Sequence, residues 1–346
     1  MIFRIVKFKL EETNFKTSSV SVIIPVHGKT AFVKNSVESI LRSDYLIKEI
    51  LIVFDEPHDP AIKLLRKHFG SKLKFVKNLG KGKWSALNTG VQNANGEIIV
   101  FVDSDTIICQ DAISRLVNHF SSSEISAVAG NIIPMKKDLF STVLKKEYLL
   151  NFLERRIIPS KNMKSLIAGN IGAFRKSVFS KINFTGETLC EDFDFSLRFQ
   201  EAGFKSVVEP KAYAFDNTPS SFKLFLKQRN RWYRGVFQVL SKNRFSPWLY
   251  INLKLLPVIS QMIFLWLLVF SILTGKSFLF IFSISLFLVH LFIIIVFGRK
   301  FSSQQSLFKE FLSFIMFFVY FYFLNFLMII IAIEEFSKFK VSWERI

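Results

Sequence analysis

Short apolar runs that end in polar or acidic residues recur through the first part of the chain. They cover residues 20–26, 50–54 and 98–102. Each run is too short for a helix and too uniformly apolar for a half-exposed strand, which is typical of strands buried on both faces of a parallel sheet. Segments with helical spacing lie between them, including residues 61–69 and 83–94. The alternation predicts an α/β domain with a mostly parallel sheet and right-handed crossovers.

Acidic residues follow two of these runs directly. Asp103 and Asp105 come after residues 98–102, and Asp55 comes after residues 50–54. Parallel strands place their carboxyl ends at one edge of the sheet, where ligands bind in open α/β folds. An isolated Asp-x-Asp is more often a polar turn. A second acidic strand end at the same edge instead favours a site for Mg²⁺ or Mn²⁺, which in turn holds a diphosphate.

Two later segments have compositions that suit a binding site. Residues 80–88 carry two glycines and two lysines before a helix, an arrangement that favours an anion but is weak alone. Residues 168–175 contain small residues that line a cleft or simply form a tight loop.

Three acidic residues open a predicted helix that reaches residue 202. They are Glu191, Asp192 and Asp194. Acids in a first turn complement the helix dipole, which accounts for one or two of them. A carboxylate held near an acceptor hydroxyl would instead serve as a general base.

The second half of the chain changes character. Residues 220–240 are basic and aromatic together, which predicts a helix at a membrane surface. Gln228, Arg231 and Trp232 share one face of that helix, and we expect this face to look into a site.

Three uncharged apolar runs follow, at residues 255–273, 277–297 and 311–333. Each has at least 19 residues, which is long enough to cross a bilayer. His290 and Asn325 lie inside them, and we interpret both as neutral side chains packed between helices. The loop between the second and third runs is basic, which the positive-inside rule places in the cytoplasm with the predicted α/β domain. Residues 1–10 are interrupted by three cations and do not form a signal peptide.

Composition narrows the class of partner. The net charge of +19 indicates an anionic partner, either a phosphate-bearing ligand or an acidic lipid surface. No zinc-finger spacing or RNA-recognition motif is present, so we expect no nucleic acid. Two cysteines, Cys109 and Cys190, provide neither a disulfide framework nor a metal cluster.

Together these motifs resemble the inverting glycosyltransferases of family 2. More narrowly, they are similar to the membrane-integrated branch that contains cellulose, chitin and hyaluronan synthases and glucosylceramide synthase. The resemblance covers residues 18–240, and its most restrictive element is Gln-x-x-Arg-Trp at residues 228–232. The other matching segments are Val22-Ile-Ile-Pro25, Asp55, Lys83 with Ala86-Leu87-Asn88, Asp103-Ser-Asp105 and Glu191-Asp192.

The resemblance implies a GT-A fold and a role for each matching residue. It implies that Asp192, beside Glu191, is the general base, and that Asp103 and Asp105 hold Mg²⁺ or Mn²⁺ with the diphosphate. Five residues would bind the nucleotide sugar: Pro25, Asp55, Lys83, Asn88 and Asp103. Gln228, Arg231 and Trp232 would close over diphosphate and acceptor. Gly169, Asn170, Phe174 and Arg175 would line the acceptor path.

The sequence departs from the family pattern in three respects. Cys190 stands where the Thr-Glu-Asp motif has threonine. No transmembrane run precedes the catalytic region, unlike in the large processive synthases, and three spans make a thin wall for a polymer channel.

The resulting prediction is a membrane-bound glycosyltransferase in the plasma membrane, multi-pass, with its catalytic domain in the cytoplasm. It would transfer sugar from a nucleoside-diphosphate sugar, with a UDP-sugar as the expected donor, to a lipid-linked or polysaccharide acceptor. Membrane lipids are a further expected partner. A processive polysaccharide synthase is the alternative, and a non-catalytic nucleotide-binding membrane scaffold is the alternative of another class. The predicted domains are an N-terminal segment (1–18), a catalytic domain (19–218), an amphipathic helix (219–245), a transmembrane region (249–335) and a tail (336–346).

Overall fold

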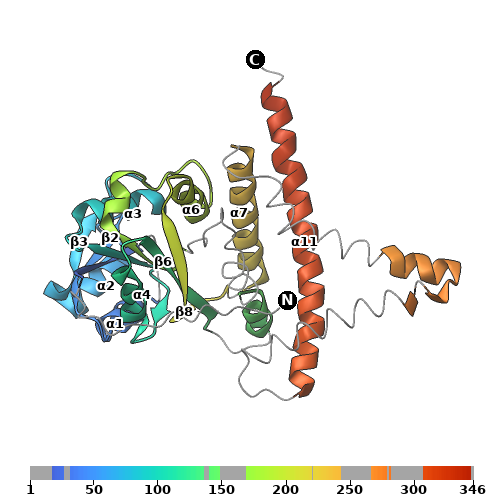
Figure 1. The fold of residues 1–346 in the computed structure, drawn as a ribbon, viewed down its shortest axis with the longest axis horizontal. Coiled ribbons are helices and arrows are strands. Elements are labelled where there is room, and N and C mark those ends of the chain that lie inside the picture. The colour runs from blue at the N-terminus through green and yellow to red at the C-terminus, as the bar shows by residue number, and fades with distance from the viewer. Residues whose placement is uncertain are drawn as a thin grey trace.

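The computed structural model describes residues 18–26, 32–135, 140–148, 169–219, 221–242, 266–278, 280–281 and 307–343. Its largest part is an α/β domain (Figure 1). Helix α7 (Phe222–Ser241) follows this domain in the chain and lies between it and the long helix α11 (Leu307–Trp343).

One eight-stranded sheet forms the centre of the domain, in the order β3-β2-β1-β4-β7-β6-β8-β5. The first four strands in this order are parallel, as the alternating pattern predicts. Strand β7 runs antiparallel to both of its neighbours, and β6 and β8 form a further parallel pair. The strand bounds are β1 Val20–Val26, β2 Ile47–Phe54, β3 Lys74–Lys77, β4 Ile98–Val102, β5 Ile107–Ile108, β6 Ile125–Pro134, β7 Ile171–Arg175 and β8 Lys205–Asp216.

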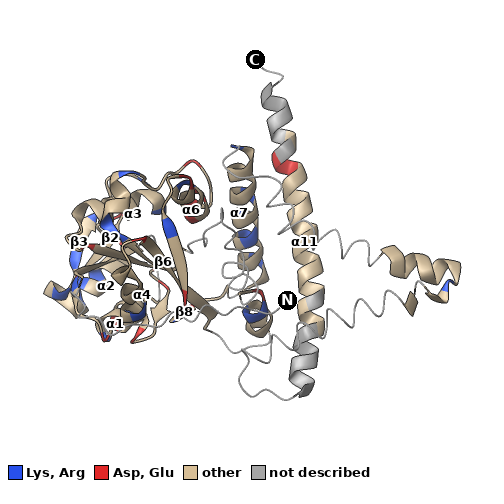
Figure 2. Cartoon of the chain, in the orientation of Figure 1, with Lys and Arg blue, Asp and Glu red and all other residues tan. Residues whose placement is uncertain are grey.

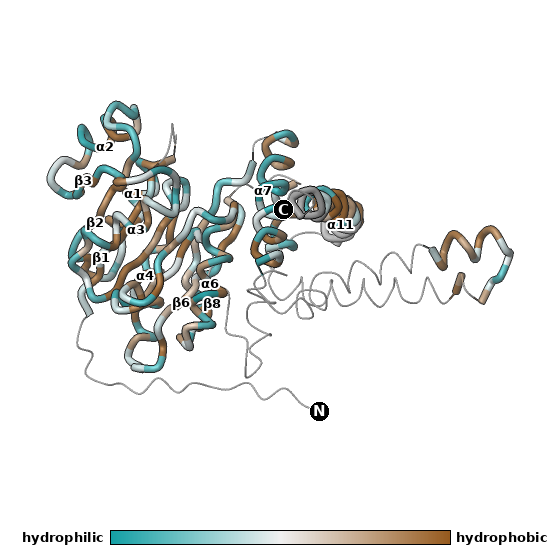
Figure 3. Tube along the Cα trace, turned by 90° about the horizontal axis from the view of Figure 1, so that it is seen from above, coloured by the Kyte–Doolittle hydropathy of each residue, from teal (hydrophilic) through white to brown (hydrophobic). Residues whose placement is uncertain are grey.

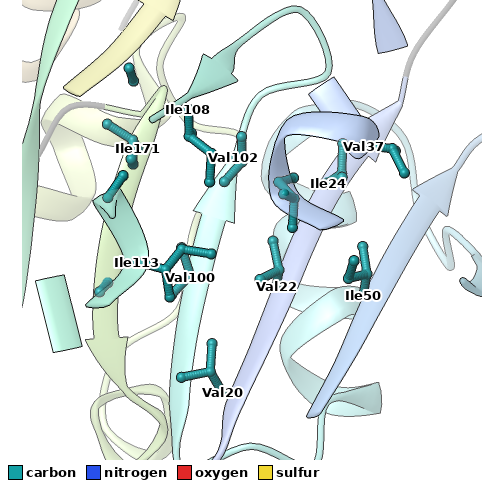
Figure 4. Close-up of a cluster of buried hydrophobic side chains, with 14 of the residues drawn as sticks. Val20, Val22, Ile24, Val37, Ile50, Val100, Val102, Ile108, Ile113 and Ile171 are labelled. Carbon is teal, nitrogen blue, oxygen red and sulfur yellow. The ribbon is translucent and has the colours of Figure 1, made fainter. Parts of the chain in front are cut away.

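Helices cover both faces of this sheet, which explains why the central strands are apolar throughout. All residues of β1 and β4 are buried. Helices α1 (Val33–Leu41), α2 (Pro60–Phe69) and α4 (Ala112–Asn118) pack on one face, where Figure 4 shows Val22, Val100 and Ile113 in the shared core. Helices α3 (Lys83–Asn93) and α6 (Glu191–Glu201) pack on the other. Short 3₁₀ turns lie at Gly70–Lys72, His119–Ser121 and Lys176–Ser180.

Phenylalanine fills much of the second core. The rings of Phe184 and Phe195 are stacked with centroids 4.2 Å apart, and Phe101 meets Phe174 and Phe179 edge-on. Such ring pairs add about 0.5–1.5 kcal/mol each beyond the area that they bury. The high phenylalanine content therefore contributes to the core of the α/β domain as well as to the apolar C-terminal runs.

Helices α7 and α11 lie side by side in two perpendicular views (Figures 1 and 3). Two apolar clusters join them, one around Phe225 and Leu324 and the other around Phe237 and Met328. Near one end of the contact, Arg234 forms ion pairs with Glu334 and Glu335. Helix α7 is therefore held by α11 along most of its length.

One helix among the described residues is long and apolar enough to cross a membrane. It is the segment Ile315–Glu335 of α11, with a mean hydropathy of 2.4. This segment contains most of the third predicted run, including Asn325. Of the first run, residues 266–273 are described and helical, whereas most of the second run, with His290, lies outside the described residues.

The close packing of α3 on the sheet provides a test of the fold. A Cβ atom at Gly90 would lie 2.5 Å from Ile23 Cγ2 and 3.2 Å from Val53 Cγ2. Because an added methyl in a filled core forces its neighbours to move, we expect Gly90→Ala to destabilise the protein by about 1–3 kcal/mol. The midpoint of thermal unfolding of the detergent-solubilised protein measures this change.

Gln92→Ala, on the exposed face of the same helix, is the matched control and should stay within about 0.5 kcal/mol of the wild type. A rise in the midpoint for Gly90→Ala, as for an exposed helical glycine, would contradict the packing described here.

Candidate active site

The carboxyl ends of β2 and β4 lie at one edge of the sheet. Both strands pair in parallel with β1, so Val22 is aligned with Ile50 on one side and with Val100 on the other. Asp55 follows β2, while Asp103 and Asp105 follow β4. The predicted convergence of these acidic strand ends is confirmed.

Lys83 is bonded to the carboxylates at this edge. It is the first residue of α3, and its Nζ lies 2.7 Å from Asp103 Oδ1, 2.9 Å from Asp103 Oδ2 and 3.4 Å from Glu191 Oε1. Loss of water around Lys83 acts to lower its pKa, but Asp103 and Glu191 outweigh that effect and raise it. Lys83 is therefore a fixed positive charge that joins two predicted motifs.

Asp192 lies next to this ion pair, in the first turn of α6. Its Oδ2 accepts a hydrogen bond from the Gly169 amide at 3.0 Å, and its Oδ1 accepts one from the Phe193 amide at 2.8 Å. Loss of surrounding water raises the pKa of Asp192, and Glu191 raises it further, against the opposing effect of Lys83. A carboxylate with a raised pKa is a better proton acceptor, which suits a general base.

Strand β7 brings only part of the predicted acceptor segment to the site. The Asn170 carbonyl accepts a hydrogen bond from the Asp103 amide at 3.3 Å, so the start of β7 lies beside the acidic edge. The predicted positions of Phe174 and Arg175 beside the acidic edge were wrong. Because β7 is antiparallel to β4, Phe174 and Arg175 pair with Ile99 and Ile98 at the far end of the strand.

The side chains of these two residues have structural roles there. Phe174 is buried in the aromatic core. Arg175 donates hydrogen bonds to the carbonyls of Phe120, Ser122 and Ile125. Both side chains therefore lie away from the Asp103 edge, where the acceptor path was expected.

Asp55 is held by an asparagine that the sequence analysis did not single out. Asn78 follows β3 and donates from Nδ2 to Asp55 Oδ1 at 2.6 Å. Its Oδ1 accepts from the hydroxyls of Ser85 and Thr89 on α3, at 2.8 and 3.2 Å. The position of Asn78, directly after a strand parallel to β2, is the signal that would have identified it.

Two predicted nucleotide-binding residues have other partners. Pro25 is buried within β1, opposite Val53. Asn88 donates to the Phe184 carbonyl at 2.8 Å and accepts from the Phe184 amide at 3.0 Å. The Asn88 amide thus holds the loop that leads to α6.

Asp216, the last residue of β8, is a further acid that the sequence analysis missed. Burial raises its pKa to about 7, and the nearby charges of Asp105 and Asp103 add to the shift. The Tyr148 hydroxyl donates to Asp216 Oδ2 at 3.4 Å. The position of Asp216 at the end of an alternating apolar strand is the signal that would have identified it.

Helix α7 meets the catalytic domain where α6 begins. The Cys190 thiol donates to the Trp232 carbonyl at 3.4 Å, and a Cβ atom at Gly235 would lie 2.5 Å from Cys190 Sγ. Glycine at residue 235 therefore allows α7 to lie directly against the residue that precedes Glu191 and Asp192.

A cavity of about 470 Å³ opens between α7 and the Cys190 loop. Its lining contains two leucines and a set of polar and basic side chains, among them two of the three predicted closing residues. The lining residues are Leu189, Leu224, Lys227, Gln228, Asn230, Arg231 and Arg234. The cavity thus combines positive charge with apolar surface.

The donor set at this edge fits a divalent cation that a diphosphate helps to bind. Mg²⁺ is commonly held by one or two carboxylates together with substrate phosphates. Asp103 and Asp105 supply that number, and the charges of both add to the rise that burial causes in the pKa of Asp216. Among the described residues no group of three His, Cys, Asp or Glu side chains forms a complete metal cage.

The pKa of Asp216 leads to a test of stability against pH. Its pKa of about 7 lies above the value of 3.8 for a free aspartate. The carboxyl therefore contributes stability that is fully present below about pH 4 and is lost as the pH rises through 7. We expect the stability of Asp216→Asn relative to wild type to increase by about 3 kcal/mol between pH 5 and pH 8 in chelator.

Thermal unfolding in detergent at the two pH values measures this difference. Glu201→Gln, which replaces an exposed acid on α6, is the control and should not change it. An equal difference between Asp216→Asn and wild type at both pH values would contradict the described environment of Asp216.

Known proteins are similar to this chain in sequence and in fold. The chain is 28% identical over 248 residues to the probable glycosyltransferase YdaM of Bacillus subtilis (strain 168), covering 68% of this chain and 59% of that protein. It is 25% identical over 238 residues to the poly-beta-1,6-N-acetyl-D-glucosamine synthase of Staphylococcus epidermidis, covering 67% and 58%. The chain thus spans less than two thirds of the length of these curated relatives.

The fold is similar to that of the mannosyltransferase PcManGT from Pyrobaculum calidifontis, solved in complex with GDP-Man and Mn²⁺. The TM-score is 0.60 at 16% identity, over 92% of this chain and 87% of that one. This similarity confirms the expected GT-A fold. Residues 98–332, more than half of the chain, match the family described as Glycosyl transferase family group 2. The protein therefore belongs to glycosyl transferase family group 2.

Proposed function

We propose that the protein is an inverting glycosyltransferase that acts at the cytoplasmic face of a membrane. It transfers a sugar from a nucleoside-diphosphate sugar to a hydroxyl of a lipid-linked or polysaccharide acceptor. The observation that carries the proposal is the position of Asp192, a carboxylate of raised pKa that lies beside the Lys83–Asp103 ion pair. A proton acceptor thus adjoins a charged edge suited to a phosphate-bearing donor.

Each step uses a group at this edge. Asp192 takes the proton of the acceptor hydroxyl while the oxygen of that hydroxyl bonds to the anomeric carbon of the donor. The bond from that carbon to the diphosphate oxygen breaks, and its electron pair leaves with the nucleoside diphosphate. Attack from the face opposite the leaving group inverts the anomeric centre. The two amides bonded to Asp192 fix the direction of its oxygens before the acceptor arrives.

Charge on the leaving diphosphate requires compensation, which usually contributes the largest part of catalysis in such transfers. Lys83 and Arg231 supply positive charge from α3 and α7. A divalent cation held by Asp103 and Asp105 would neutralise further charge there. Asp55, which accepts a hydrogen bond from Asn78 at the neighbouring strand end, would contact the nucleobase.

The membrane location is proposed from the surface of α11. Between Ile315 and Ile333 this helix has no charged residue (Figure 2). Val319, Phe326 and Ile333 are each more than 60% exposed on the side not covered by the protein. A bilayer would bury this surface. Because α7 lies against α11, acceptors in the membrane would then reach the site from the lipid side.

A processive polysaccharide synthase is the second candidate. The similarity to the poly-beta-1,6-N-acetyl-D-glucosamine synthase of Staphylococcus epidermidis favours it. Both candidates are tested by incubating the purified protein with UDP-sugars or GDP-mannose, Mn²⁺ and a membrane lipid extract. Released nucleoside diphosphate and product mass are the measurements. A single added sugar on a lipid indicates one transfer, a polymer indicates a synthase, and no transfer with any donor contradicts both.

One test of the proposed function concerns the divalent cation. Asp105→Asn removes one of the two carboxylates proposed to hold it, so we expect transfer to fall to near background while the protein folds and inserts. Chelator should have the same effect on the wild type, with recovery on addition of Mn²⁺. Unchanged transfer by the wild type in excess chelator would contradict the assignment. Asp111→Asn, at an acid before α4, is the control for the loss of one negative charge.

Another test distinguishes the proposed roles of Asp192 and Trp232. Asp192→Asn removes the proton acceptor but leaves the donor contacts, so the single-turnover rate should fall by roughly 10²–10⁴-fold with donor affinity within a few-fold of wild type. Trp232→Ala removes a side chain proposed to contact the acceptor, and should raise the KM for acceptor as well.

Rapid-quench measurement of sugar transfer and titration with the donor separate these effects. A normal single-turnover rate for Asp192→Asn would exclude Asp192 as the base, and Glu191 would be tested next.

A further inference from the structure

Arg229 is a buried charge for which the proposed mechanism has no use. Its side chain is 1% exposed and is the largest of the fully buried side chains described. It lies on α7 within an apolar cluster that contains Phe225, Leu144 and Leu324. A charge removed from water is costly unless it is paired, and an apolar side chain in its place is often at least as stable. The free-energy cost of burying this charge suggests that Arg229 has a role other than packing.

The guanidinium is held from two other helices. Its Nη2 donates to Glu147 Oε2 at 2.6 Å, from the helix at residues 140–148, and to the Tyr320 hydroxyl of α11 at 3.2 Å. The Tyr320 hydroxyl in turn donates to the same Glu147 oxygen. Burial acts to lower the pKa of Arg229, but Glu147 outweighs it and raises the pKa, so the side chain stays charged at every working pH.

The same guanidinium contacts two residues of the Gln-x-x-Arg-Trp motif. Its Cζ lies 4.3 Å from the centre of the Trp232 ring, and its Nη1 donates to Gln228 Oε1 at 3.3 Å. A cation over the face of an indole fixes the orientation of that ring. The hydrogen bond likewise limits the rotation of the Gln228 amide.

We propose that Arg229, clamped by Glu147 and Tyr320, is a positioning residue that sets the orientation of Trp232 and Gln228 for acceptor binding. Because Tyr320 belongs to α11, this apolar helix also helps to hold Gln228 and Trp232 of the Gln-x-x-Arg-Trp motif in the orientation that binds acceptor. This proposal rests on the proposed function, because it assigns Arg229 a role through residues that act in sugar transfer.

Three variants separate positioning from packing. Arg229→Met keeps most of the volume without the charge or the hydrogen bonds, whereas Arg229→Lys keeps a cation near the ring. Glu147→Gln and Tyr320→Phe, combined in one protein, loosen the clamp and leave Arg229 in place. Each is assayed for acceptor kcat/KM with the donor found in the screen, for binding of UDP or GDP with Mn²⁺, and for its unfolding midpoint.

We expect Arg229→Met to lower acceptor kcat/KM by roughly 10²-fold, as for a small displacement of a site residue, while nucleotide affinity stays within a few-fold of wild type. Arg229→Lys should recover part of the loss, and the clamp double variant should lie between. If Arg229 acts through Trp232, adding Arg229→Met to Trp232→Ala should change kcat/KM by less than about threefold, because the two effects are not additive.

A matched control breaks a different link between the same helices. Glu334→Gln with Glu335→Gln removes the ion pairs of Arg234 to α11 without touching Arg229, Gln228 or Trp232. A loss of kcat/KM in this control equal to that of Arg229→Met would overturn the proposal in favour of general docking of α11. Equal activities for Arg229→Met and Arg229→Lys, or fully additive effects with Trp232→Ala, would overturn it as well.

Asp192→Asn distinguishes failure of this proposal from failure of the proposed function. If Asp192→Asn is inactive and Arg229→Met has wild-type kinetics, only the positioning role fails. If Asp192→Asn is fully active, the proposed base is wrong whatever Arg229 does, and the positioning role is then decided by the Trp232 comparison alone.

Discussion

Compensation of negative charge at one edge of the sheet is the constraint on which the site depends. Parallel strands bring Asp55, Asp103 and Asp105 to that edge, and α6 adds Glu191 and Asp192. Lys83 forms ion pairs with Asp103 and Glu191. The amide N–H groups of Gly169 and Phe193 donate hydrogen bonds to Asp192. Burial raises the pKa of Asp216, and the charges of Asp105 and Asp103 add to that shift, so further negative charge lies at this edge.

Strands β1, β2 and β4 and the acidic residues that follow β2 and β4 were predictable from the sequence, because both follow from local patterns. A buried parallel strand is apolar throughout, and an acid directly after it must lie at the carboxyl edge. The direction of β7 was not predictable in this way. Nothing local in residues 171–175 shows whether the strand runs with β4 or against it, and that choice decides whether Arg175 or Asn170 lies beside Asp103.

The hydrogen-bond partners of Asn88 and Arg229 could not be predicted from local sequence patterns either. Asn88 bonds to a main chain 96 positions later, and Arg229 to side chains 82 positions before it and 91 after it. Spacing places Arg229 on a helix but does not reveal that the helix is covered on several sides. An arginine in an amphipathic helix ordinarily faces water or lipid head groups, so its burial follows only from the packing of α7 between two other helices.

The contact between Cys190 and Gly235 has a consequence for how motion of α7 can be observed. Cys190 is 7% exposed, and burial raises the pKa of its thiol, so a thiol reagent reaches it only when α7 separates from the catalytic domain. The other cysteine, Cys109, is partly exposed and is replaceable by serine to leave one reporter. The alkylation rate of Cys190 then measures how often α7 separates from that domain, and comparing the rate with and without nucleotide shows whether nucleotide changes this frequency.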